Sequence, residues 1–132
     1  MPSAFLTNDV AGVTGRVRDQ DIEANYATMA ELARLHSIRV VFASLLPVNN
    51  DSSEDAKESF ALRPLERLLA INRWLKEYCV TNGLVYLDYY TALVDDNGML
   101  KKELSDDGLH PNSAGYKLMA PLAADAIAKA LK

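Results

Sequence analysis

The sequence lacks the features that mark several classes of protein. Its single cysteine, Cys79, excludes a disulfide within the chain, and its place in a helical pattern of apolar residues predicts a buried structural thiol. Basic residues number 14 and acidic residues 18, with no block of like charge, which argues against nucleic-acid binding. No apolar run approaches the length of a membrane span, and Met1 to Leu6 do not form a signal peptide. What remains is an ordinary globular domain, with no indication of its cellular location.

Patterns that hold metals and phosphates are also missing. His36, His110 and Cys79 do not stand at metal-ligand spacings, and Gly12 and Gly15 alone do not make a phosphate-binding loop. His36 comes at the end of a predicted helix, where a structural role is expected because a cation interacts favourably with the helix dipole. We therefore expect no metal and no cofactor.

Apolar residues recur with helical spacing in some segments and form nearly continuous runs in others. The predicted elements are a strand stub at 3–6, a helix at 22–35 capped by Asp21, a strand at 38–46, a helix at 64–82, a strand at 84–87, a short helix at 90–94 and a helix at 113–131. Strands that alternate with helices of this length favour parallel pairing. The sequence therefore predicts one domain over residues 1–132, a three-layer α/β/α sandwich with a parallel sheet.

The predicted sheet has few strands. Two full strands and a stub are fewer than the about 4–6 strands common in open sheets. We therefore interpret the domain as N-terminally truncated, with an exposed sheet edge and with one face of the last helix lacking a packing partner. An exposed edge favours strand addition, so a homodimer through this edge is the partner that we expect.

The loop before the last helix carries the pattern with the most chemical content. Asp107 precedes His110 by three residues, so its carboxylate can contact one imidazole nitrogen while the other takes a proton from a nucleophile. On its own, such a pair more often caps a helix and contacts solvent. Asn8 follows the strand stub, where an amide could donate to a developing oxyanion; the alternative is a plain Asn-Asp turn, which often ends a strand.

Two segments resemble conserved blocks of the SGNH hydrolases, the GDSL-type esterases and lipases. Asp107-Gly108-Leu109-His110-Pro111 resembles the Asp-x-x-His-Pro block, and Thr7 to Gly12 resembles the Gly-x-Asn-Asp block. The order of the intervening elements also fits, so the resemblance covers nearly the whole chain. It implies the C-terminal portion of a flavodoxin-like hydrolase, with His110 as general base, Asp107 as its orienting acid and Asn8 in the oxyanion hole.

The sequence departs from the family pattern at two points. Leu6 stands where the Gly-x-Asn-Asp block has glycine, and the Gly-Asp-Ser block that carries the nucleophile is absent. Ser105 and Ser113 fit loop and helix-cap positions, and Ser44 lies in a predicted buried strand. None of these serines has the glycine-flanked strand-to-helix context of an exposed nucleophile.

Three functions remain open at this stage. By resemblance, the parent enzyme hydrolyses small-molecule, carbohydrate or lipid esters through an acyl-enzyme. The first alternative is a non-catalytic remnant that dimerises or needs a complementary N-terminal segment. The second is slow hydrolysis by water activated at His110, without a covalent intermediate.

Overall fold

The computed structural model describes residues 18–49, 54, 57 and 65–132. Its elements, in chain order, are α2 (Asp19–Leu35), β1 (Val41–Ala43), α4 (Leu65–Thr81), β2 (Val85–Leu87), α5 (Tyr90–Leu93), the 3-10 helix η1 (Lys102–Leu104) and α6 (Ser113–Ala130). The predicted alternation of helices and strands is confirmed. The predicted stub at 3–6 and Asn8 lie outside the described residues.

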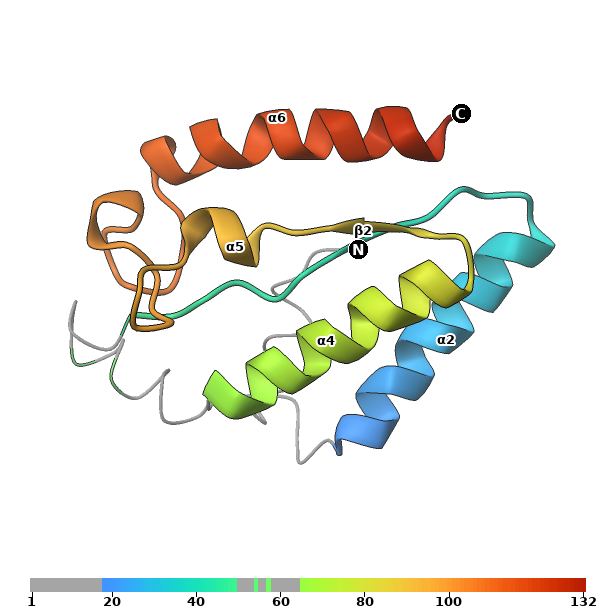
Figure 1. The fold of residues 1–132 in the computed structure, drawn as a ribbon, viewed down its shortest axis with the longest axis horizontal. Coiled ribbons are helices and arrows are strands. Elements are labelled where there is room, and N and C mark those ends of the chain that lie inside the picture. Colours follow the sequence, from blue (N-terminus) through green and yellow to red (C-terminus); the bar gives the residue numbers. More distant parts are fainter. Residues whose placement is uncertain (1–17, 50–53, 55–56, 58–64) are drawn as a thin grey trace.

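The two strands β1 and β2 pair in parallel, with Val41 opposite Val85 and Ala43 opposite Leu87. Helix α4 forms the crossover between them, as parallel pairing requires. Figure 1 shows α6 on one side of the strands and α2 with α4 on the other. The predicted three-layer α/β/α arrangement with a parallel sheet is therefore confirmed.

The main core lies between α2, α4 and the sheet. Helix α2 contributes Ile22, Tyr26 and Ala30 at four-residue spacing, which puts them on one helix face. The buried side chains of this cluster are those of Ile22, Tyr26, Ala30, Phe42, Leu45, Leu68, Ile71, Leu75 and Cys79. Cys79 is fully buried, as predicted, and burial raises the pKa of its thiol to about 11. This thiol therefore stays protonated at neutral pH and belongs to the core.

Strand β1 is shorter than the predicted strand at 38–46, and a side chain from α4 explains where it ends. Ser44 N still donates to Leu87 O at 2.9 Å, as a continuing ladder would. At the next residue, Leu45 N donates to Asn72 Oδ1 at 2.7 Å, and Asn72 Nδ2 donates to Leu45 O at 3.2 Å. The Asn72 amide thus takes the place of a strand partner and satisfies both backbone groups.

Two further predictions about local structure are wrong. Asp21 does not cap α2, because Arg18 is the N-cap and Asp21 lies within the first turn, paired with Arg18 at 3.0 Å. Asn49 was predicted at the start of a solvated loop but is 1% exposed. Its side chain donates to Leu100 O at 2.7 Å, and this bond makes burial of the amide possible.

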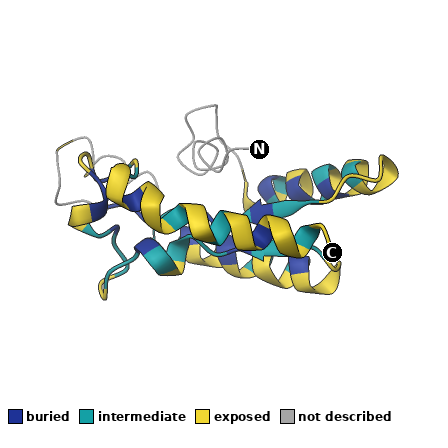
Figure 2. Cartoon of the chain, turned by 90° about the horizontal axis from the view of Figure 1, so that it is seen from above, coloured by how far each residue is buried: buried dark blue, intermediate teal, exposed yellow. Residues whose placement is uncertain are grey.

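Helix α6 covers the second face of the sheet (Figure 1) and leaves part of its own predicted apolar stripe exposed. Within its predicted apolar stripe Ala126 is buried, whereas Leu118 and Ile127 are 45% and 53% exposed. Figure 2 shows the exposed surface that runs along α6. A second cluster of Leu93, Leu100 and Leu104 packs against Met119 near the start of α6. Within the described residues, no helix has the length and apolar character needed to cross a membrane.

Candidate active site

The loop at 105–112, between η1 and α6, is closed at its neck. Asn112 N donates to Leu104 O at 2.8 Å, and Ser105 forms a bridge with Pro111. Asn49 N donates to Gly108 O at 2.8 Å and so joins the loop to the segment that follows β1. The loop therefore lies beyond the carboxyl end of a parallel strand, where open α/β sheets bind their ligands.

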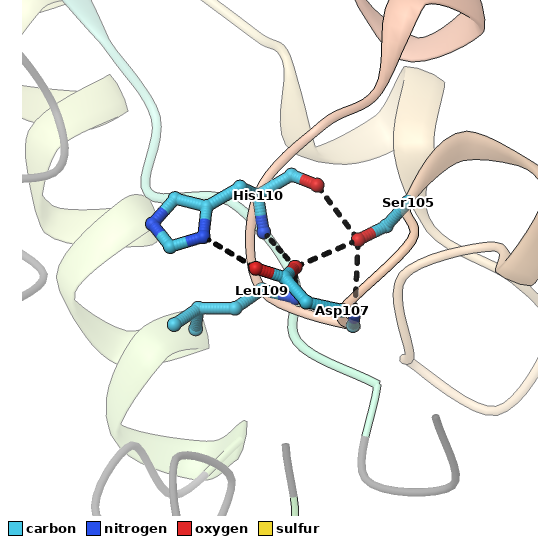
Figure 3. Close-up of polar contacts among 5 residues, drawn as sticks. Ser105, Asp107, Leu109 and His110 are labelled. Atoms are coloured by element: carbon cyan, nitrogen blue, oxygen red, sulfur yellow. Dashed lines mark hydrogen bonds and ion pairs between the residues drawn. The ribbon is translucent and has the colours of Figure 1, made fainter. Parts of the chain in front are cut away.

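Asp107 and His110 contact each other within this loop, as predicted. Asp107 Oδ2 lies 2.7 Å from His110 Nδ1. The other carboxylate oxygen, Oδ1, accepts hydrogen bonds from Leu109 N at 2.8 Å and from His110 N at 2.7 Å. Gly108 has φ +79°, a left-handed conformation that glycine adopts without strain, and it lets the chain turn around the carboxylate. Figure 3 shows the carboxylate of Asp107 enclosed by these donors.

The electrostatics of the pair define the role of each imidazole nitrogen. Burial raises the pKa of Asp107, but hydrogen bonds from the His110 ring and from the His110 and Leu109 backbone outweigh it, so this pKa lies well below its ordinary value. Asp107 is therefore ionised at neutral pH and can only accept hydrogen bonds. Nδ1 of His110 must then carry the proton, which leaves Nε2 as the basic nitrogen. The His110 side chain is 69% exposed, so a substrate can reach it.

Asn112 begins α6 and holds it to the loop. Its side chain accepts a hydrogen bond from Gly115 N at 3.1 Å, so Asn112 is the N-cap and the predicted cap, Ser113, is the first helical residue. The side-chain nitrogen Nδ2 of Asn112 donates to Glu103 O at 3.1 Å. One asparagine therefore caps the helix and also bonds to η1 at the start of the loop.

Neither Ser44 nor Ser105 is placed to act as a nucleophile for His110. Ser44 is fully buried, as predicted, and its hydroxyl accepts a hydrogen bond from Tyr90 N at 2.9 Å. Ser105 is 5% exposed, and its hydroxyl contacts Asp107 and the backbone of the loop. None of the described serines hydrogen-bonds to the His110 ring. Figure 3 shows Ser105 on the opposite side of Asp107 from the imidazole.

The structure brings together Asp107 and His110, and it adds two polar residues that the sequence analysis did not select. Asn8 lies outside the described residues, so its role in an oxyanion hole stays a prediction. Asn49 and Ser105 are buried polar residues that bond to the loop. The sequence signal for Asn49 was its position directly after a buried apolar run. Within the described residues, no three metal-binding side chains lie close enough to hold an ion.

Comparison with protein families identifies the family of this chain. The model of the GDSL-like lipase/acylhydrolase family matches residues 6–118, a range that includes both segments with the family pattern. A comparison with curated proteins gave no match.

Several solved structures are similar to this chain. A protein from Bacteroides fragilis described as an acylhydrolase is 32% identical, with a TM-score of 0.82 over 96% of this chain and 59% of its own. A GDSL-like lipase from Bacteroides thetaiotaomicron is also 32% identical, with a TM-score of 0.81 over 94% and 59% of the two chains. An esterase domain from a zebrafish retrotransposon protein, 22% identical, shares the fold with a TM-score of 0.64 over 87% and 62%. The present chain thus spans 59% of the length of the two bacterial structures.

Proposed function

The chain belongs to the GDSL-like lipase/acylhydrolase family, and on this premise we propose that it supplies the acid–base pair for hydrolysis of an ester. The observation that carries the proposal is the 2.7 Å contact between Asp107 Oδ2 and Nδ1 of an exposed His110. An ionised carboxylate on one nitrogen and an accessible second nitrogen are the two requirements for a general base of this kind.

The proposed chemistry follows from this geometry. Nε2 of His110 takes the proton from the oxygen that attacks the ester carbonyl, and Asp107 stabilises the imidazolium that forms. The imidazolium then returns this proton to the oxygen of the leaving alcohol when the tetrahedral intermediate collapses. Asn8, at the position of the family's Gly-x-Asn-Asp block, donates to the oxyanion in this proposal.

The proposed mechanism also requires a group that supplies the attacking oxygen. The sequence contains no Gly-Asp-Ser, so His110 would act on a serine from a complementary segment or on water. The relatives described as an acylhydrolase and a lipase support an acyl ester as the substrate, and we propose esters of small molecules, carbohydrates or lipids. Because this chain spans 59% of their length, their activity is extended to it only as part of the proposal.

The test is hydrolysis of p-nitrophenyl acetate by the purified chain beside two histidine variants. We expect His110→Ala to lower the protein-dependent rate roughly a hundred-fold or more, because it removes the proposed base. His36→Ala is the matched control, since His36 is also exposed but lies at the end of α2, and the rate should persist in it. A His110→Ala rate equal to that of the wild-type chain would overturn the proposal.

A second candidate function is a non-catalytic chain that pairs with another polypeptide. Helix α6 favours it, because Tyr116, Ile127 and Leu131 are 57%, 53% and 67% exposed and their spacing places them on one side of the helix. In an antiparallel pair of α6 helices centred between residues 123 and 124, Tyr116 would meet Leu131 of a second copy. The small residue Ala120 would then meet Ile127 of that copy.

Sedimentation equilibrium at micromolar concentration tests this candidate, because it distinguishes a dimer from a monomer. We expect a dimer for the wild-type chain and a monomer for Ile127→Lys, because the lysine would place a charge within the apolar contact. Asp125→Lys, on the other side of the helix, is the control and should remain dimeric. A compact wild-type monomer would contradict pairing through either the helix face or the sheet edge.

A further inference from the structure

The hydroxyl of Ser105 stands at the centre of the loop that carries the acid–base pair. Its oxygen accepts a hydrogen bond from Gly108 N at 2.9 Å. The same oxygen lies 2.7 Å from His110 O and 3.2 Å from Asp107 Oδ1. A hydroxyl has one proton, so it donates to one of these oxygens at a time, and the shorter contact favours the His110 carbonyl.

The surroundings of Ser105 restrict this hydroxyl to its present place. Ser105 is 5% exposed and sits at the neck of the loop, where it forms a bridge with Pro111. Gly108, whose N–H donates to the Ser105 hydroxyl, is also buried, and its carbonyl accepts a hydrogen bond from Asn49 N. Removal of the hydroxyl would leave a buried N–H without this acceptor, so the turn that encloses the carboxylate of Asp107 would have to rearrange.

We propose that Ser105 is a positioning residue, whose hydroxyl keeps the Asp107 carboxylate on Nδ1 of His110 and so maintains the tautomer with a basic Nε2. It contacts the backbone of the histidine, the carboxylate of the acid and the turn between them, and it does not touch the ring. Its catalytic consequence rests on the proposed function of His110, whereas its effect on the ring is measurable in the absence of any hydrolysis.

The test is to read the tautomer directly from the ¹⁵N shifts of the His110 ring in labelled protein, at a pH where imidazoles are neutral. In the wild-type chain we expect a single tautomer with the proton on Nδ1. In Ser105→Ala we expect the two tautomers to mix, and in Ser105→Thr, which retains the hydroxyl, the wild-type signal should return. Ser113→Ala, an exposed serine at the start of α6, is the matched control and should leave the ring unchanged.

Hydrolysis of p-nitrophenyl acetate gives the second measurement on the same variants. We expect kcat to fall roughly ten-fold in Ser105→Ala with KM unchanged, because a partner that orients a functional group acts on the transition state and not on substrate binding. A wild-type chain without His110-dependent hydrolysis would refute the proposed function, yet the ring signals would still decide the role of Ser105.

The inference is overturned if Ser105→Ala retains the wild-type ring signals. If that variant fails to fold, amide hydrogen exchange in the wild-type chain tests the role of Ser105 instead. The amide proton of Gly108 should exchange with solvent at least a hundred-fold more slowly than that of the exposed Asp106, because it is bonded to the Ser105 hydroxyl. Equal exchange rates at the two amides would contradict the hydrogen bond and the proposal with it.

Discussion

The core beneath the sheet and the loop at 105–112 are stabilised by different means. The core packs apolar side chains from α2, α4 and the strands, among them Leu68, Ile71 and Leu75, each no more than 2% exposed. The loop has few apolar contacts and is held by hydrogen bonds among Ser105, Asp107 and backbone groups. Packing of the first kind contributes most of the folding free energy, whereas directional bonds of the second kind hold specific atoms in place.

The difference predicts that folding stability and the geometry of the Asp107–His110 pair can be changed separately. A substitution in the core should lower the free energy of unfolding and leave the folded loop intact. A substitution in the loop should change the geometry of the Asp107–His110 pair at a small cost in stability. A core variant that changed the geometry of the pair, or a loop variant that lost much of the free energy of unfolding, would contradict this separation.

Leu75→Ala should have the largest effect on stability. Leu75 is fully buried between α4 and the sheet, so the substitution removes apolar contacts and leaves a cavity, at a cost of about 2–5 kcal/mol. Urea unfolding measures this change. Leu69→Ala on the same helix, where the side chain is 37% exposed, should cost much less. Equal losses in the two variants would contradict a core confined to the buried face of α4.

Gly115→Ala should have an intermediate effect, because Gly115 lies where α6 contacts the loop. An added Cβ would approach Leu104 O to 2.8 Å and Pro111 Cβ to 2.9 Å, closer than such contacts allow. Alanine normally favours a helix, yet here we expect a loss of about 1–3 kcal/mol in urea unfolding. A variant more stable than the wild-type chain would show that α6 does not press on the neck of the loop.

Asp107→Asn should have the smallest effect on stability and a defined pH dependence. The pKa of Asp107 is lowered in the folded chain. The contribution of its ionised carboxylate to the free energy of unfolding is therefore present above the unfolded pKa of about 3.9 and is lost as pH falls through the folded pKa. Because this side chain is 49% exposed, we expect less than about 1 kcal/mol at pH 5.

Urea unfolding at pH 5 and pH 3 measures this pH dependence. The difference in stability between the wild-type chain and Asp107→Asn should shrink at the lower pH. Asp106→Asn removes a charge from the same loop and serves as the control. A difference that grew toward low pH would contradict the direction of the pKa change.

The sequence predicted those parts of the structure that follow from local patterns. The helical spacing of apolar residues predicted α2 and α4. The Asp-x-x-His spacing correctly predicted the contact between the carboxylate of Asp107 and the ring of His110. The end of β1 was not predictable, because it depends on Asn72, which lies 27 positions from Leu45 and meets it only in the folded chain. Asn49 was misjudged for the same reason, since its partners Leu100 and Gly108 are distant in sequence.

The exposed side of α6 shows a different limit of the sequence. The helical spacing of residues such as Ile127 predicts an apolar stripe on α6. It does not predict how much of that stripe the sheet covers. A helix that is apolar on more than one side buries only the side that meets the rest of the chain.

Asp107 and His110 are proposed to act as one unit, and a double-mutant cycle on hydrolysis of p-nitrophenyl acetate tests this most directly. The cycle compares the wild-type chain, Asp107→Asn, His110→Ala and the double variant. Because Asp107 acts only through the histidine in this account, we predict that the double variant is no slower than His110→Ala alone. Rate losses that multiply in the double variant would show that the two residues act independently, and would contradict the account.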